Sequence, residues 1–226
     1  MMEPGDLSIL GLSLGVALAS TIAIFPAGIG LAWFLAGEKG RFRVIVESIL
    51  TLPLVLPPTA IGILLLTILS KDGWIGHLLS HLGIEIMFTW SAAVLASAVM
   101  SLPLLVRSAR TAFEEVDPRL IGIARTLGDT PWRVFWRVTF PLAWRGILAG
   151  TLLAFCRALG EFGATILVAG NIPGRTQTLA LAIFHRAQLG RDDDAFRLVA
   201  IVGVVAFIAV YITERLEKHR RQQYET

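Results

Sequence analysis

The sequence predicts an all-α integral membrane protein with five transmembrane helices, forming a single domain over residues 1–226. Hydrophobic residues make up 55% of the chain and charged residues only 16%, and the mean hydropathy is +0.70. Soluble globular proteins carry about 25% charged residues, so this chain has too little polar surface for a soluble domain. Its apolar residues also fall into five stretches, each comparable to the roughly 20 residues that a helix needs to cross a bilayer.

The first two predicted spans cover residues 7–36 and 44–70. The first has no charged side chain in 30 positions, although Pro26 lies within it and favours a kink or an early end. In the second, three prolines fall within six positions: Pro53, Pro57 and Pro58. Because each proline removes a backbone donor inside the membrane, we expect a discontinuous helix facing the interior of a dimer, in preference to a plain packing kink.

The other three predicted spans cover residues 88–106, 142–169 and 198–213, and the distribution of Lys and Arg gives the orientation. Three connecting segments hold 14 of the 20 Lys and Arg residues: 37–43, 107–145 and 214–226. The segments on the other side, 1–6, 71–87 and 170–197, hold only 5 Lys and Arg residues, and Arg157 is the remaining one of the 20. Loops rich in Lys and Arg stay in the cytoplasm, so the sequence predicts a cytoplasmic C-terminus and an external N-terminus.

The sequence contains no pattern typical of a catalytic, cofactor or metal site. CxxC, HExxH, Walker A and GxSxG motifs do not occur, so we expect no enzyme activity and no phosphate hydrolysis by the chain itself. His77 and His81 are a poor metal site without further ligands, and an amphipathic stretch explains them better. The acidic residues 192–194 are expected in a solvated loop. Basic residues cluster between apolar runs, which argues against binding to nucleic acid.

The most informative segment is the predicted cytoplasmic loop 107–141. Asp117 followed by Pro118 is typical of a helix N-terminus, and Gly128 is placed to end that helix, which predicts a short helix over residues 118–127. A helix of this length is not stable alone in water. It must therefore dock into a separate cytoplasmic protein or, alternatively, pack on the membrane ends of its own chain.

The spacing of Ala124, Gly128, Val138 and Pro141 resembles the loop with which ABC importer permeases contact their ATPase. Three positions depart from the family pattern: Gly122, Ile123 and Phe140. The resemblance implies the type I ABC importer permease fold, with residues 118–127 as the coupling helix in a groove of a cytoplasmic ATP-binding subunit. It also implies the residues that couple to this ATPase: Asp117, Ala124, Arg125, Gly128 and Pro141.

Arg157 and Glu161 are the second candidate functional feature, because charged side chains at membrane depth are costly and must be paired. In a continuous fourth span they lie on one face, four residues apart, about 24–30 Å from its cytoplasmic start at 1.5 Å per residue. Gly160 and Gly163 would let another helix approach. The pair either pins helix packing or lines and gates a water-filled path, and the residues alone do not decide between these roles.

The string around the pair, AFCRALGEFGATILVAGNIPGRTQTL, resembles the permeases that import tetrahedral oxyanions, and its Asn171–Gly174 segment resembles their molybdate branch. The resemblance implies a multi-pass protein of a bacterial or archaeal inner membrane, importing molybdate or tungstate. It further implies a homodimer, a cytoplasmic ATPase dimer and an external oxyanion-binding protein as partners. Arg157, Glu161 and Gly163 would then belong to the translocation path or its gate. Two alternatives remain open: sulfate or thiosulfate import, and an ion-coupled secondary transporter.

Overall fold

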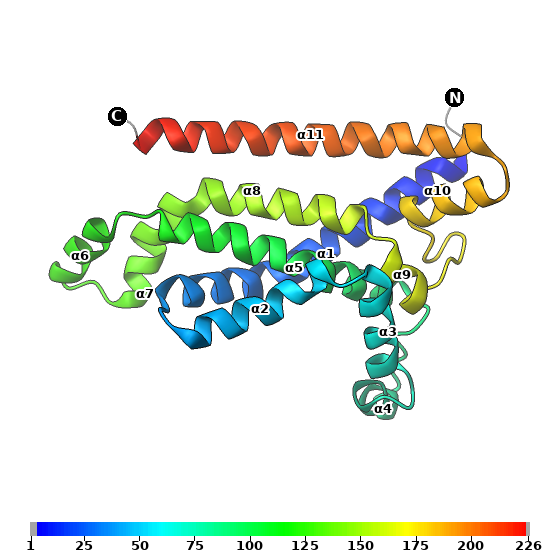
Figure 1. Cartoon of the computed structure of the whole chain (residues 1–226), viewed down its shortest axis with the longest axis horizontal. Coiled ribbons are helices and arrows are strands. Elements are labelled where there is room, and N and C mark those ends of the chain that lie inside the picture. Colours follow the sequence, from blue (N-terminus) through cyan, green and yellow to red (C-terminus); the bar gives the residue numbers. More distant parts are fainter. Residues whose placement is uncertain (1–3, 225–226) are drawn as a thin grey trace.

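The computed structural model describes residues 4–224, with side chains from residues 5 to 215, and this part of the chain contains helices and no β-strand. Four helices are long: α1 (Pro4–Gly37), α5 (Trp90–Glu114), α8 (Phe140–Leu159) and α11 (Asp192–Tyr224). The others are α2 (Arg41–Val55), α3 (Pro58–Leu69), α4 (Trp74–His81), α6 (Pro118–Thr126), α7 (Pro131–Val134), η1 (Phe135–Thr139), α9 (Gly163–Val168) and α10 (Leu179–Gln188). The two termini lie at opposite ends of the bundle (Figure 1).

The core lies where α1, α5 and α8 pack together. Its largest cluster of buried residues is rich in alanine, including Ala32, Ala109 and Ala154. Small residues let membrane helices approach closely, and the glycines of the bundle show how closely. A Cβ added to Gly150 would come 2.5 Å from the Cβ of Ser108 on α5, so α8 and α5 fit together only because this position carries no side chain.

The buried hydroxyl groups of α1 are satisfied within the protein, as a membrane interior requires. Ser13, Ser20 and Thr21 of α1 each donate to the backbone carbonyl four residues earlier, at 2.7 Å. Ser13 also accepts a 2.7 Å hydrogen bond from the backbone N–H of Leu179. This bond ties α1 to the start of α10, across 166 positions of sequence.

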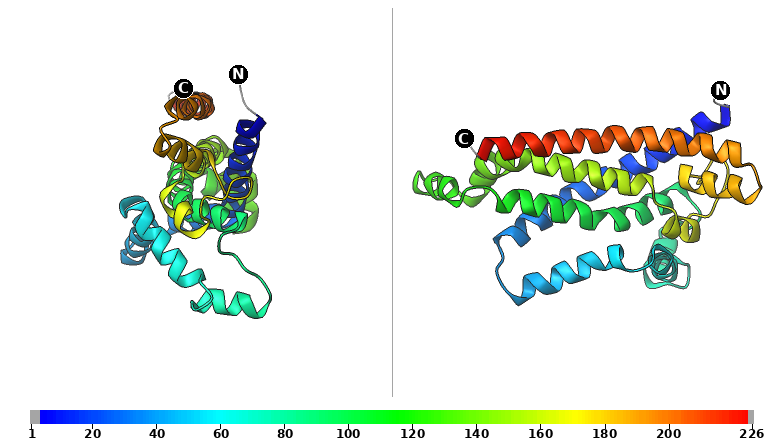
Figure 2. Two further views of the ribbon diagram at one scale, coloured as in Figure 1. Left: turned by 90° about the vertical axis from the view of Figure 1, so that its right-hand side faces the viewer. Right: turned by 45° about the horizontal axis from the view of Figure 1, so that its top comes forward.

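The helix of the predicted second span is broken, as its prolines predict. Helix α2 ends at Val55, Leu56 and Pro57 are extended, and α3 begins at Pro58 after a change of direction of 109°. A residue that precedes a proline is pushed out of the helical region. Leu56 precedes Pro57, and Pro57 precedes Pro58, so both residues are affected. Figure 2 shows α2, α3 and α4 to one side of the bundle, and no residue of α2 is buried.

The helix boundaries near the fourth and the last predicted spans differ from those expected. The helix of the fourth span ends at Leu159 instead of continuing to residue 169, because the chain turns at Gly160 and resumes as α9. The acidic residues 192–194 are not in a loop but form the first turn of α11, where carboxylates favour the helix dipole. Asp194 also pairs there with Arg191 and Arg197.

Four helical stretches of the described residues are long and apolar enough to cross a membrane: α1, α5, the run from α7 to α8, and α11. The bent pair of α2 and α3 is a fifth if the two helices form one span. The chain is therefore a multi-pass membrane protein built from helices.

Candidate functional site

Helix α6 begins where the sequence predicts, at an aspartate followed by a proline. The Asp117 carboxylate accepts a 2.8 Å hydrogen bond from the backbone N–H of Arg119, and Pro118 occupies the first turn. The proline has no N–H of its own, so it leaves one fewer unpaired donor at the helix start. The N-terminus of α6 is therefore defined by side chains of the helix start itself and needs no contact with another protein.

The other end of α6 is closed by Gly128, which has φ +90°. Its N–H donates to the carbonyl of Arg125 at 3.0 Å, and the N–H of Asp129 donates to the carbonyl of Ala124 at 3.1 Å. These two bonds form the Schellman motif, which needs a left-handed residue after the last helical turn. Glycine adopts this conformation without steric cost, and so it fixes the length of α6.

Helix α6 presents two different faces. On its inner face Ala124 is buried, and Ile121 packs on the cluster formed by α1, α5 and α8. On its outer face Leu120, Ile123 and Leu127 are 44%, 56% and 80% exposed. The helix lies at one extreme of the molecule, past the ends of α5 and α8 (Figure 1). It thus packs on its own chain by one face and leaves the opposite, apolar face exposed.

The segment after α6 is an aromatic cluster that joins it to the bundle. Phe135 lies at its centre, with ring centroids 4.8 Å from Trp33 of α1 and 5.9 Å from Phe113 of α5. The next residues form the π-helical turn η1, which leads directly into α8. Pro141 lies in the first turn of α8. Because proline has no N–H to bond to the preceding turn and its ring needs room, the wider π-helical turn before it suits this position.

Arg157 and Glu161 do form an ion pair, but they do not share a helix face as the sequence predicts. The Arg157 Nη1 to Glu161 Oε2 distance is 2.7 Å, and Glu161 lies after the end of α8 with its side chain 1% exposed. Its other oxygen accepts a 2.8 Å hydrogen bond from the backbone N–H of Ala164. The carboxylate therefore connects α8 with α9, since the turn at Gly160 brings it to the start of the next helix.

Gly163 is the place where α9 meets α3. A Cβ added there would lie 2.7 Å from the Cβ of Pro58 and 3.3 Å from the backbone nitrogen of Thr59. Gly62 of α3 faces α9 in the same way, because a Cβ added at Gly62 would lie 3.0 Å from the Cα of Ala164. Gly160, by contrast, has only its own helix carbonyl at 3.6 Å. Of the two glycines predicted to admit another helix, only Gly163 does so.

This difference predicts the effects of two matched substitutions. Gly163→Ala is expected to lower stability by about 1–3 kcal/mol, because an added methyl group overpacks the contact with Pro58. Gly160→Ala adds the same group where no other helix is near and is expected to change stability by less than about 0.5 kcal/mol. The midpoint of thermal unfolding in detergent measures both. Equal midpoints for the two variants would contradict the close contact of α9 and α3.

The sequence-predicted residues form two separate groups. Asp117, Ala124, Arg125 and Gly128 gather at α6, whereas Arg157, Glu161 and Gly163 gather where α8 meets α9. Helix α8 has 20 residues, so about 30 Å separates the two groups at 1.5 Å per residue. The two groups therefore lie at opposite ends of α8, one at the short helix α6 and the other at a buried polar junction.

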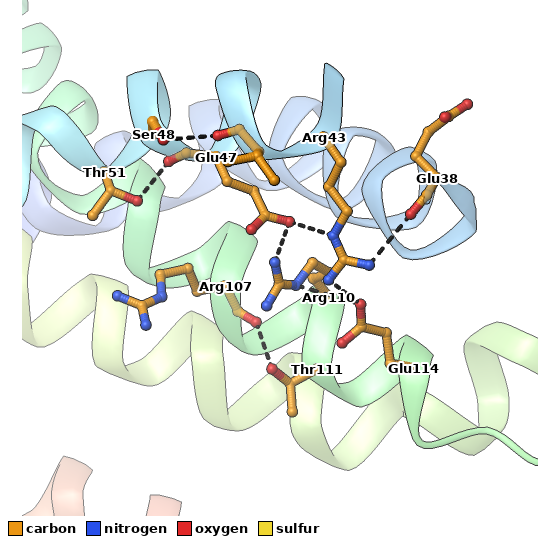
Figure 3. Close-up of polar contacts among 10 residues, drawn as sticks. Glu38, Arg43, Glu47, Ser48, Thr51, Arg107, Arg110, Thr111 and Glu114 are labelled. Atoms are coloured by element: carbon orange, nitrogen blue, oxygen red, sulfur yellow. Dashed lines mark hydrogen bonds and ion pairs between the residues drawn. The ribbon is translucent and has the colours of Figure 1, made fainter. Parts of the chain in front are cut away.

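A cluster of four charged side chains was not predicted from the sequence (Figure 3). Arg43 and Glu47 come from α2, and Arg110 and Glu114 come from α5. Arg43 bonds both carboxylates at 2.6 Å, and Arg110 also pairs with both. The four charges cancel and tie α2, which is otherwise loosely attached, to α5. Sequence distance hides this cluster, because only contact between the two helices brings its halves together.

A second unpredicted pair joins Asp6 to Arg186, with 2.6 Å between carboxylate and guanidinium. Asp6 is buried, with 1% of its side chain exposed, Arg186 is half-buried, and the pair connects the start of α1 with α10. Removing one partner of such a pair leaves an uncompensated charge. The pair thus fixes the helix hairpin of α10 and α11 against α1, together with the bond from Leu179 to Ser13.

The two histidines of the short helix α4 lie against each other. His77 and His81 contact each other with ring centroids 4.6 Å apart, and no group of three His, Cys, Asp or Glu gathers within the described residues. Beside them, Lys71 and Glu85 form an exposed pair at 2.6 Å. Their hydrogen bond lowers the pKa of Glu85 and raises the pKa of Lys71. Such exposed pairs contribute little to stability.

Comparison with known proteins gives a consistent result along the chain. The model of the family "binding-protein-dependent transport system inner membrane component" matches residues 24–222. The molybdenum transport system permease protein ModB of Haemophilus influenzae is 40% identical over 220 residues, covering 96% of each chain. ModB of Escherichia coli K12 is 45% identical over 214 residues, covering 94% of this chain and 93% of that one. A probable sulfate transport system permease protein of Chlorokybus atmophyticus is 37% identical over 186 residues, covering 82% of this chain and 65% of that one.

Solved structures share the fold. A bacterial ABC transporter that imports the polysaccharide alginate superposes with a TM-score of 0.73 at 20% identity, covering 98% of this chain and 80% of that one. The MetNI methionine ABC transporter superposes with a TM-score of 0.73 at 16% identity, covering 97% of this chain and 99% of that one. The predicted fold class is confirmed, since both neighbours are ABC transporters with the same arrangement of helices.

Proposed function

We propose the following function for this chain, which belongs to the family of binding-protein-dependent transport system inner membrane components: it is the permease subunit of an ABC importer that passes molybdate, with tungstate as a close chemical analogue, into the cytoplasm. The choice of molybdate as the substrate is supported by the 40–45% identity to molybdenum transport permeases over nearly the whole chain. The chain is a transport subunit of the inner membrane, and ATP hydrolysis belongs to a partner chain.

The contact with that ATPase is assigned to α6. Its outer face offers an apolar stripe of Leu120, Ile123 and Leu127, which suits a groove on another protein. Asp117 and Gly128 set its two ends, Ala124 holds its inner face, and Arg125 lines a cavity of about 370 Å³ below it. Pro141 starts the helix that carries motion from this contact into the membrane.

Two copies of the chain are assigned to one pore, with the C-terminus cytoplasmic and the N-terminus external. The apolar residues of α2 are mostly exposed, among them Val44, Ile49 and Val55, which leaves this helix available for a second copy. An external oxyanion-binding protein would deliver the substrate. The spans that serve this pore are those of α1, of α2 with α3, of α5, of α8 and of α11.

Arg157, Glu161 and Gly163 are assigned to the gate. They lie at the junction of α8, α9 and α3, where the chain leaves helical geometry inside the protein. Irregular backbone at membrane depth is tolerated where it is buried in protein or lines a cavity. A junction of short helices held by one ion pair can change its arrangement without unfolding a long helix, which is what a gate between two states requires.

The test is uptake of labelled molybdate into proteoliposomes that contain this chain, its ATPase and the external binding protein. ATP-dependent uptake that excess sulfate does not suppress is expected. Uptake that sulfate suppresses would assign the chain to sulfate transport, the alternative that the 37% identity to a sulfate permease favours. Uptake driven by a pH gradient without ATP would instead support a secondary transporter, and would contradict the proposal.

A further inference from the structure

A groove of about 470 Å³ lies between α2 and α5, on the side of α2 that faces the bundle. Most of its lining is apolar, including Leu52, Val55 and Val106. Its polar lining residues come from both helices: Glu47, Ser48, Thr51, Arg107 and Arg110. The groove therefore combines a low-dielectric wall, which strengthens electrostatic interactions, with charged and hydroxyl groups that could hold a small ion.

The charges around this groove do not cancel completely. Arg43 and Arg110 are balanced by Glu47 and Glu114 through the four ion pairs described above. The Arg107 side chain has neither an ion pair nor a hydrogen bond within the described residues, whereas the Arg107 backbone carbonyl accepts a hydrogen bond from the hydroxyl of Thr111. Figure 3 shows its guanidinium directed away from the ion-pair cluster. The three arginines and two glutamates leave one net positive charge, and it is carried by Arg107.

The α2 side of the groove contributes two hydroxyl-bearing side chains, whereas Arg107 comes from α5. Ser48 and Thr51 are three residues apart on α2, and their hydroxyls donate to carbonyls of their own helix at 2.8 Å and 2.6 Å. A hydroxyl can rotate to donate elsewhere, and both belong to residues that line the groove. A guanidinium with several donors, in one groove with two hydroxyl-bearing side chains, is a chemistry that recognises an oxyanion.

We propose that this groove is an oxyanion-binding subsite on the translocation path, with Arg107 as its charged group and Ser48 and Thr51 as its hydroxyl donors. The assignment rests on the proposed function, because it takes the imported oxyanion as the ligand. Arg107 lies near the end of α5 that leads to α6, so the subsite would be the last contact before release into the cytoplasm. One unpaired arginine binds an anion weakly enough for the anion to leave.

The phosphate of a lipid headgroup has the same chemistry and could occupy the same arginine, since arginines near helix ends reach toward the membrane surface. The test must therefore separate a free oxyanion from a lipid. A thiol at position 52 can report both, because Leu52 lines the groove and is 49% exposed, and its replacement leaves Arg107 and both hydroxyls in place.

The experiment uses the full chain carrying Leu52→Cys and Cys156→Ala in lipid nanodiscs. The rates of modification by a negatively charged sulfonate methanethiosulfonate and a positively charged ammonium methanethiosulfonate are compared. Arg107→Gln is expected to lower the ratio of negative to positive reagent by about threefold or more, the effect of one nearby charge in a partly aqueous site. The matched control is Arg175→Gln, which removes the same charge from an exposed position outside the groove and should leave the ratio unchanged.

Molybdate at millimolar concentration is then added, with sulfate in parallel. Slower reaction with the negative reagent, seen with Arg107 and lost in Arg107→Gln, supports the subsite. Protection by sulfate in place of molybdate supports the subsite too and counts only against molybdate as the substrate. The proposal is overturned if Arg107→Gln leaves the ratio unchanged, or if neither anion protects. It is equally overturned if only nanodiscs with anionic lipid slow the reaction, which would identify a headgroup as the occupant.

Discussion

Replacing Arg157 alone with leucine is expected to damage the protein more than replacing Arg157 and Glu161 together. The Glu161 side chain is 1% exposed, and the Arg157 guanidinium at 2.7 Å is its only ion-pair partner among the described residues. Without that partner an acid would remain buried at membrane depth, where unpaired charges are costly. Breaking a buried pair by removing one partner costs about 3–5 kcal/mol. We therefore expect Arg157→Leu to lose most of its folded protein and its transport.

The double variant is best made as Arg157→Leu with Glu161→Gln. Glutamine keeps a carbonyl oxygen that can accept the 2.8 Å bond from the backbone N–H of Ala164, so the connection between α8 and α9 survives. The charge is absent from both positions, and replacing both members of a buried pair is often close to neutral. The double variant should thus fold much better than the single one, even if its gating differs.

Thermal midpoints and yields of monodisperse protein in detergent measure the folding of both variants, and proteoliposome uptake measures their transport. If the two variants unfold at the same temperature, the ion pair is not mutually neutralising. Recovery of folding without recovery of uptake in the double variant would separate the two roles left open by the sequence. It would give the pair a function in gating beyond packing.

Local signals explain why α6 and the break in the second span could be predicted. The Asp117–Pro118 start and the Gly128 end are decided by backbone geometry within a few residues. The membrane class follows from composition alone, because apolar stretches of this length have few other structures available. These features depend on neighbouring residues in the chain, so a sequence displays them directly.

The polar contacts that hold the helices together could not be predicted in the same way. Asp6 and Arg186 are 180 positions apart, and the cluster of Arg43 and Glu114 depends on how α2 lies against α5. Even for Arg157 and Glu161 the i,i+4 spacing predicts a continuous helix, which the structure does not have. After the turn at Gly160, α9 packs against α3, and this tertiary contact cannot be read from local spacing. Sequence spacing identified the partners there, but not their geometry.

Gly128→Val is expected to uncouple ATP hydrolysis from transport while leaving membrane insertion intact. Gly128 has φ +90°, and no atom outside its neighbours lies within 4 Å of an added Cβ. The effect of valine must therefore come from the backbone, where a β-branched residue in this region is strained by about 1–3 kcal/mol. That strain opposes the two closing bonds from Gly128 and Asp129, so the last turn of α6 should fray.

Fraying would displace Leu127, which is 80% exposed and belongs to the apolar face assigned to the ATPase contact. A loss of 1–3 kcal/mol from that contact corresponds to roughly a five- to 150-fold weaker coupling, at about 1.4 kcal/mol for each factor of ten. Molybdate taken up for each ATP hydrolysed, measured in proteoliposomes, should fall accordingly. Gly128→Asn is the matched control, because asparagine tolerates left-handed geometry, and its ratio should stay near that of the unmodified chain.

The two variants together separate docking from general stability. Both replace the same glycine and both enlarge it, so a difference between them reflects the tolerance of the left-handed conformation. If valine lowered the thermal midpoint of the permease but left the uptake per ATP unchanged, α6 would matter only for packing on its own chain. If valine and asparagine coupled equally well, the closing turn at Gly128 would not transmit the ATPase motion, and the assignment of α6 as the docking helix would lose its main support.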